Sequence, residues 1–244
     1  RMRPLGAHRG APPAVGRCAG SVIGMVDAAL PAAATVVLLR DADDPALPGI
    51  EALLLRRPDR GSFAGAWVFP GGRVDATDAG DDEDARALSA AIRETREETG
   101  LELAHDDLAA LSHWTPPEET SRRYRTWFFV ARAPQAEVEP NPGEIEEHRW
   151  LRPQDALDAH AEGDLLLFPP TWVTLHALAG APSVDAALDA VRAAGVDRFV
   201  TQHDAEAARF LWHGDESYDG AAETPDGPRH RLLTAERRWR YERR

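Results

Sequence analysis

The segment Arg93–Gly100, with the sequence RETREETG, carries three glutamates at helical spacing directly before a glycine. Glu94, Glu97 and Glu98 fall at positions i, i+3 and i+4, which share one sector of an α-helix. Like charges at this spacing repel one another, and a divalent cation would relieve the repulsion. Hard oxygen ligands of this kind suit Mg²⁺ or Mn²⁺. The alternative is a solvated acidic helix in which neighbouring arginines form local ion pairs.

A glycine-rich turn precedes the acidic helix and adds a second feature of a metal site. The segment FPGG, Phe69–Gly72, ends a short predicted strand, and an exposed glycine carbonyl there could supply another ligand. An acidic, loop-like stretch follows from Asp75 to Asp84 and suits the positive N-terminal end of a helix. The helix is predicted to end at Thr99, with Gly100 as its C-terminal cap.

Strand-like and helix-like patterns alternate along the rest of the chain. Strands are expected at Ala34–Leu39, Glu51–Arg57, Ala66–Phe69, Leu111–Thr115, Thr126–Ala131 and His148–Leu151, the first two paired as a hairpin. Helices are expected at Pro153–His160, Thr171–Ala179 and Ser183–Ala194. Apolar pieces follow at Arg198–Thr201, Ala208–Trp212 and Arg231–Thr234. The long loop Gly214–Pro228 is either a mobile flap or a simple connector.

The composition excludes several classes of function. The sequence has 28 basic residues, all arginine, and 41 acidic residues. The resulting formal charge of −13 disfavours a nucleic acid partner. The absence of lysine excludes Schiff-base chemistry and the lysine-dependent P-loop. The single Cys18 excludes a disulfide scaffold, and no apolar run is long enough for a membrane span or a secretory signal. We therefore expect a soluble, cytoplasmic protein without membrane partners.

The segment Arg93–Leu101 resembles the box of the Nudix hydrolase family, G-x5-E-x7-REUxEExGU, where U is a bulky aliphatic residue. Every fixed position of this right half is in register, and only Thr95 departs, in an aliphatic slot. Gly72 lies 21 positions before Arg93, which is an insertion of seven residues relative to the family's pattern. Ala85 then occupies the slot of the isolated glutamate.

Two neighbouring acidic residues could take over from that glutamate. They are Glu83 and Asp84, and at the start of the predicted helix each is expected to act as a helix-capping group rather than a ligand.

The resemblance covers roughly residues 32–180 and implies the domain organisation. We expect a loose N-terminal extension over residues 1–30, a Nudix hydrolase domain over residues 31–180, and a C-terminal extension over residues 181–244 that packs on the same domain. The implied fold class is α/β, an α/β/α sandwich around a mixed β-sheet, with an α+β extension at the C-terminus. The sequence leaves open whether that extension completes the sheet, covers the pocket or forms a homodimer surface.

The resemblance also implies roles for individual residues. The implied metal ligands are Glu94, Glu97, Glu98 and the Gly72 carbonyl, with Arg93 orienting the carboxylates. A later loop often supplies a base or a further ligand in such enzymes, and Glu144 is the preferred candidate, ahead of Glu146 and Glu147. Because guanidinium groups bind phosphate oxygens in a forked geometry, Arg56, Arg60 and Arg125 are candidate substrate ligands, with surface ion pairing as the alternative for each.

The implied reaction is metal-dependent cleavage of the diphosphate linkage of a nucleoside diphosphate derivative. Four segments resemble the branch of peroxisomal coenzyme A diphosphatases and their bacterial relatives: LLLRRPDRGSFAGAWVFPGGRVD, HWTPPEETSRRYRTWFFVARAP, EIEEHRWLRPQDAL and LLLFPPTWVTLHAL. Arg56, Gly65 and FPGG match that branch's signature, whereas Arg57 and Gly61 depart from it. Coenzyme A or an acyl derivative is the favoured substrate. The alternatives are ADP-ribose, nucleotide sugars, dinucleotides, or a Nudix-like module that binds a nucleotide without hydrolysing it.

Overall fold

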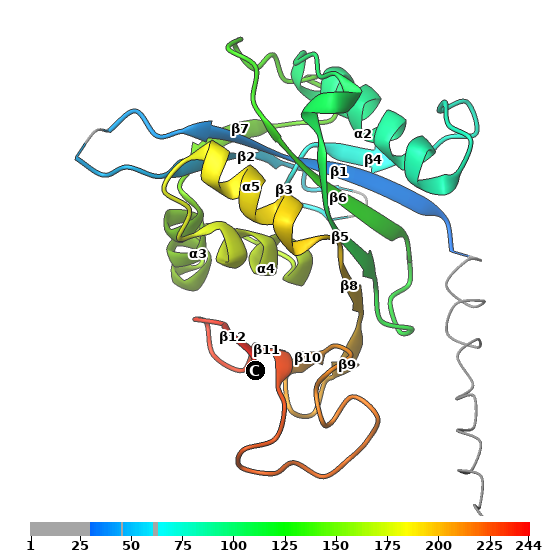
Figure 1. Cartoon of the computed structure of the whole chain (residues 1–244), viewed down its shortest axis with the longest axis vertical. Helices are drawn as coiled ribbons and strands as arrows, with labels where there is room; N and C mark the ends of the chain where they lie inside the picture. Colours follow the sequence, from blue (N-terminus) through cyan, green and yellow to red (C-terminus); the bar gives the residue numbers. More distant parts are fainter. Residues whose placement is uncertain (1–29, 45, 61–62) are drawn as a thin grey trace, which may run out of the picture.

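Within the part of the chain that the structure describes, a mixed eight-stranded sheet lies between one α-helix on one face and three on the other (Figure 1). The computed structural model describes residues 30–44, 46–60 and 63–244. The expected extension over residues 1–30 therefore lies, except for its last residue, outside the described residues, as does Cys18. Among the described residues, no helix combines the length and the apolar character that a membrane span needs.

The sheet and its helices follow the expected alternation closely. The strands of the main sheet are β1 (Ala32–Asp41), β2 (Ile50–Arg56), β3 (Trp67–Val68), β4 (Gly71–Arg73), β5 (Ala109–Thr115), β6 (Arg125–Arg132), β7 (Glu147–Leu151) and β8 (Asp197–Val200). The helices are α2 (Glu83–Thr99), η1 (His105–Asp107), α3 (Pro153–Glu162), α4 (Pro169–Leu178) and α5 (Val184–Ala194). A further four strands are β9 (Gln202–Asp204), β10 (Arg209–Leu211), β11 (His230–Leu233) and β12 (Arg240–Arg243).

The strand order is β3-β2-β1-β6-β5-β8, with β4 paired to β1 and β7 paired to β2. β1 runs parallel to β6, and β5 runs parallel to β8, while the other pairs are antiparallel. The predicted hairpin of the first two strands is confirmed, with Leu39 opposite Ala52. Because β4 pairs with the N-terminal part of β1, the glycine turn lies at the same end of the sheet as the end of β2.

Alternating residues of β1 build two separate cores, because successive side chains of a strand point to opposite faces. Val36 and Leu38 pack towards α2, whereas Val37 and Leu39 pack towards α4 and α5, and all four are fully buried. The sheet is thus covered on both faces, and the predicted α/β/α sandwich is confirmed.

The C-terminal part joins the main sheet and then forms a small sheet of its own. β8 extends the main sheet beside β5, and β9 to β12 form a four-stranded antiparallel sheet below it (Figure 1). β4, β9 and β12 were not expected from the sequence. We retain residues 31–180 and 181–244 as a proposed division, with α5 and β8 of the second part in contact with strands of the first.

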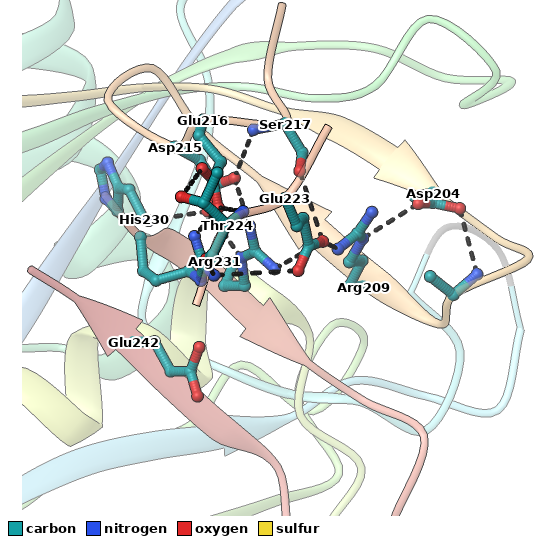
Figure 2. A network of polar contacts seen from close by, with 12 residues as sticks. Asp204, Arg209, Asp215, Glu216, Ser217, Glu223, Thr224, His230, Arg231 and Glu242 are labelled. Carbon is teal, nitrogen blue, oxygen red and sulfur yellow. Dashed lines mark hydrogen bonds and ion pairs between the residues drawn. The ribbon is translucent and has the colours of Figure 1, made fainter. Parts of the chain in front are cut away.

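The loop Gly214–Pro228 is held by a network of ion pairs, which fits a connector better than a mobile flap (Figure 2). Asp215 and Arg231 form a two-pronged ion pair with both N···O distances at 2.6 Å, and their side chains are 0% and 4% exposed. Glu216 pairs with Arg229, and Glu223 pairs with Arg231 at 2.9 Å. Burial alone would raise the pKa of Asp215, but hydrogen bonds from Arg231 and two backbone N–H groups lower it overall.

We expect Asp215→Ala to lower the free energy of unfolding by about 3 kcal/mol, because it leaves a buried guanidinium without its main partner. The exposed Asp219→Ala should change it by less than about 0.5 kcal/mol. Since the pKa of Asp215 is lower in the folded state, its contribution is present above the unfolded value of 3.8 and is lost as the pH falls below it. Urea denaturation at pH 7 and pH 3 measures both effects, and equal stability of the two variants at pH 7 would contradict them.

Candidate active site

Helix α2 places the three glutamates of the acidic segment against the glycine turn. The helix begins after Asp82, whose side chain accepts a hydrogen bond of 2.8 Å from the Ala85 N–H. It ends at Gly100, whose φ of 72° lies in the left-handed region and whose N–H donates to the Arg96 carbonyl at 2.9 Å. The predicted C-terminal cap is therefore confirmed.

The expected helix-capping role of Glu83 and Asp84 is wrong, because Asp82 takes it. Both residues instead tie the start of α2 to β6. Glu83 pairs with Arg125, and Asp84 accepts a hydrogen bond of 2.7 Å from the Trp127 indole. The extra residues before the acidic segment are therefore anchored to the sheet at two points.

Glu98 is the most deeply buried carboxylate of the acidic segment, at 1% exposure. Its Oε2 accepts a hydrogen bond of 2.9 Å from the Gly71 N–H, and its Oε1 accepts one of 2.9 Å from the Arg57 guanidinium. Burial raises the pKa of Glu98 to about 7, with repulsion from Glu94 and Glu144 adding to the effect and these two hydrogen-bond partners opposing it. A buried carboxylate with this cost of ionisation is typical of a functional site.

The glycine turn is packed tightly against β1 and α2, and at Gly71 only glycine fits. A Cβ on Gly71, whose φ is 156°, would lie 2.3 Å from the Ala34 carbonyl oxygen. A Cβ on Gly72 would lie 2.4 Å from the Glu94 carboxylate. The carboxylate is therefore in direct contact with the backbone of the turn.

We expect Gly72→Ala to lower kcat/KM at least about tenfold, because the new methyl group must displace the Glu94 carboxylate. Steady-state kinetics of the variant beside Gly143→Ala, where a Cβ would meet only the Asn141 side chain at 3.8 Å, measures the effect. Equal loss of activity in the two variants would contradict the expectation.

Arg93 links the two less buried glutamates. Its guanidinium donates to Glu94 Oε1 at 2.9 Å and to Glu97 Oε2 at 3.3 Å, and it also donates to the Arg73 carbonyl at 3.0 Å. Burial raises the pKa of Glu94, against the opposing effect of Arg93, and the pKa of Arg93 is itself raised by its hydrogen bonds, above all that to Asp78. Arg93 thus lies where an orienting partner of these carboxylates is expected.

Asp78 is a site residue that our reading of the sequence missed. Its carboxylate holds Arg93 with two hydrogen bonds, to Nε at 2.8 Å and to Nη2 at 3.0 Å, and its side chain is 4% exposed. Asp78 lies six positions after Gly72, so the spacing G-x5-acid of the box is intact when it is counted from the glycine. The insertion therefore falls after this acidic residue, and the residue in the slot counted from the helix, Ala85, is not its equivalent.

The loop that carries Glu144 is fastened to the end of α2 and to β2. The Asn141 N–H donates to the Glu98 carbonyl at 3.2 Å, and the Glu146 N–H donates to the Arg56 carbonyl at 3.0 Å. Glu144 lies close enough to Glu94 and Glu98 to raise the pKa of each by charge repulsion. Of the two alternatives, Glu146 pairs with Arg56 at 2.6 Å and Glu147 pairs with Arg149 at 2.7 Å.

The three candidate substrate arginines do not gather in one place. Arg56, at the end of β2, is paired with Glu146 and with Asp59, the latter at 3.1 Å. Arg60 is exposed and follows in the β2–β3 loop. Arg125 lies at the far end of α2, paired with Glu83. Besides Arg93, the guanidinium of Arg57 contacts one of the glutamates, Glu98, and the sequence had indicated Arg57 only as a departure from the signature.

The oxygen atoms around α2 are of the kind that binds a hard divalent cation, although they are not arranged around a common point. No group of three or more Asp, Glu, His or Cys side chains within the described residues is arranged to hold a metal ion. Arg57, Arg93 and the Gly71 N–H engage the carboxylate oxygens instead. Burial and mutual repulsion nevertheless make the negative charges of Glu94 and Glu98 costly, and a cation bound by oxygen ligands would offset that cost.

The chain is similar to several solved structures of NUDIX proteins. A NUDIX hydrolase from Alicyclobacillus acidocaldarius is 25% identical, with a TM-score of 0.59, over 66% of this chain and 96% of that chain. A C. elegans Ap4A hydrolase is 26% identical over 59% of this chain and 93% of its own, with a TM-score of 0.39. The NUDIX domain of Shewanella oneidensis NrtR, complexed with ADP ribose, is 17% identical over 61% and 85%, with a TM-score of 0.47. These last two likenesses are too distant to indicate a ligand for this chain.

No curated protein matches the chain. The NUDIX domain model matches residues 29–169, which is more than half of the chain and includes α2, the glycine turn and the Glu144 loop. Nudix hydrolases generally use divalent metal ions. The mixed sheet between helices and the acidic helix against the glycine turn agree with this match. This chain therefore belongs to the NUDIX family and is a hydrolase of diphosphate linkages.

Proposed function

We propose that this protein cleaves the diphosphate linkage of a nucleoside diphosphate derivative with the help of Mg²⁺ or Mn²⁺ held by α2. The observation that carries the proposal is the position of Glu98, buried and bonded to the Gly71 N–H beside Glu94 on the same helix. A deeply buried carboxylate with a raised pKa is costly to keep ionised, and it persists where a function requires it.

Each residue of the site has a proposed role. Glu94, Glu97, Glu98 and the Gly72 carbonyl hold the metal, and Glu144 acts as the base or as a further ligand. Arg93 keeps Glu94 and Glu97 in place and is itself held by Asp78. When bound, the cation neutralises the diphosphate and lowers the pKa of a coordinated water.

The favoured substrate class is coenzyme A or an acyl derivative, because four segments of the sequence resemble the coenzyme A diphosphatase branch. Arg56 matches the arginine of its signature, and the β2–β3 loop that follows carries Arg57 and Arg60. ADP-ribose, nucleotide sugars and dinucleotides share the same scissile linkage and form the competing class. We also propose that the protein forms a homodimer and is located in the cytoplasm.

The decisive experiment is a substrate panel with the purified full chain and Mg²⁺ or Mn²⁺. Coenzyme A, ADP-ribose, a nucleotide sugar and a dinucleotide are compared by product analysis, with a metal chelator as the control. We expect metal-dependent release of a nucleoside monophosphate, or of phosphoadenosine phosphate in the case of coenzyme A, and the highest kcat/KM on coenzyme A or its acyl derivatives. A lack of metal-dependent turnover on every substrate would refute the proposed function, and a clear preference for ADP-ribose would refute the substrate class alone.

A further inference from the structure

Three exposed apolar side chains gather in one place, and we refer to Phe63, Leu166 and Phe168 as the aromatic lip. Five large hydrophobic side chains are exposed among the described residues, and the aromatic lip contains three of them, at 50%, 50% and 36% exposure. The rings of Phe63 and Phe168 pack edge to face, with centroids 5.1 Å apart and planes at 86°. Leu166 lies two residues before Phe168 in an extended segment, between the buried Leu165 and Leu167, so it shares the face of Phe168.

Two backbone hydrogen bonds relate the aromatic lip to the candidate active site. The Trp67 N–H of β3 donates to the Leu166 carbonyl at 2.9 Å, so the segment with Leu166 lies along the edge of the sheet. The loop with Phe63 starts at Arg57, whose guanidinium contacts Glu98, and closes where the Arg57 N–H meets the Ala66 carbonyl at 2.9 Å. The aromatic lip and the carboxylates therefore lie at the same end of β2 and β3.

Phe63 is held in an unfavourable backbone conformation while half of its side chain faces solvent. Its φ of 60° lies in the left-handed region, which bulky residues rarely adopt. Its ring packs edge to face on the ring of Phe168, which is itself partly exposed. Strained residues that are not needed for packing are concentrated at ligand sites.

We propose that the aromatic lip stacks against the base of the nucleoside diphosphate derivative, a refinement that rests on the proposed function. In the proposed function the metal ligands of α2, with Arg60 of the same loop, bind the charged diphosphate, so the uncharged lip is left for an uncharged part of the substrate. A perpendicular ring pair presents a face and an edge, which suits a planar base. An acyl chain has no face to stack and requires an extended apolar trough.

The test compares two ligands that differ only in the base, AMP and ribose 5-phosphate. Their dissociation constants are measured by calorimetry with Mg²⁺ present, for the wild type, Phe63→Leu and Phe168→Leu, which keep apolar volume but lose the ring. Leu47→Ala, at a distant position that is 61% exposed, is the control. We expect AMP to bind the wild type roughly tenfold more tightly than ribose 5-phosphate. Each phenylalanine variant should lose most of that advantage, with ribose 5-phosphate and the control unchanged.

Three outcomes would overturn the proposal: a wild type without preference for AMP, a preference that survives both substitutions, or an equal loss of both ligands. The measurement does not depend on turnover. Failure of the substrate panel would therefore refute the proposed function, while failure of the AMP preference in an active enzyme would refute the aromatic lip alone.

Discussion

Glu98→Gln is expected to lower kcat by roughly a hundredfold or more, the largest loss of any single substitution in this chain. Glutamine keeps the size of the side chain and one acceptor for the Gly71 N–H, but it removes the negative charge that faces the proposed metal. Metal ions contribute several kcal/mol of transition-state stabilisation, and each 1.36 kcal/mol corresponds to a factor of about ten in rate. Steady-state kinetics with saturating Mg²⁺ measures the loss.

The same substitution should leave the fold intact. Arg57 would lose a charged partner, but its side chain is 33% exposed and can be solvated. We therefore expect the free energy of unfolding to change by less than about 1 kcal/mol. Glu102→Gln, at an exposed position just after α2, is the matched control for activity. Full activity of Glu98→Gln, or an equal loss in the control, would contradict the proposed role.

Asp78→Asn is expected to give the second largest effect, a fall in kcat/KM of about 10- to 100-fold, as is typical for residues that orient metal ligands. The asparagine cannot accept two charge-assisted hydrogen bonds from Arg93, so Arg93 would no longer be fixed between Glu94 and Glu97. The loss should appear as a higher Mg²⁺ concentration for half-maximal rate. A merely structural role would not produce this shift.

Two further variants make the Asp78 prediction specific. Asp75→Asn removes a more distant partner of Arg93, at 3.8 Å and with a side chain that is 61% exposed, and it should keep nearly full activity. Asp78→Glu keeps the carboxylate and should restore most of the Mg²⁺ response. If Asp78→Glu is as impaired as Asp78→Asn while both remain folded, a steric role replaces the orienting one.

Local sequence patterns were sufficient to predict the helix that carries the site. The glutamate spacing and the Gly100 cap act within a few residues of one another, so they could be recognised without knowledge of the fold. The strands with sustained apolar runs, β1, β2 and β6, were found for the same reason, within a few residues of their ends. β4, however, consists of Gly71, Gly72 and Arg73, and it forms only because β1 offers it a pairing edge.

The contacts between distant segments could not be predicted in the same way. Arg57 and Glu98 are 41 residues apart, and no local pattern indicates that they meet. Asp78 could be recognised from the sequence, because its spacing from Gly72 matches the box. It was missed because the position of the box's isolated glutamate was counted back from Arg93, across the insertion. The ion pairs of Asp215, Glu216 and Glu223 likewise depend on how β10 and β11 bring their arginines together.

The most direct test of the account is to locate Mn²⁺ by anomalous scattering in crystals grown with a slowly hydrolysed diphosphate analogue. We predict manganese coordinated by carboxylate oxygens of Glu94 and Glu98, against the Gly72 carbonyl and the diphosphate. Manganese bound elsewhere, with Glu98 still paired to Arg57 and Glu94 to Arg93, would contradict the assignment of α2 as the metal-binding helix.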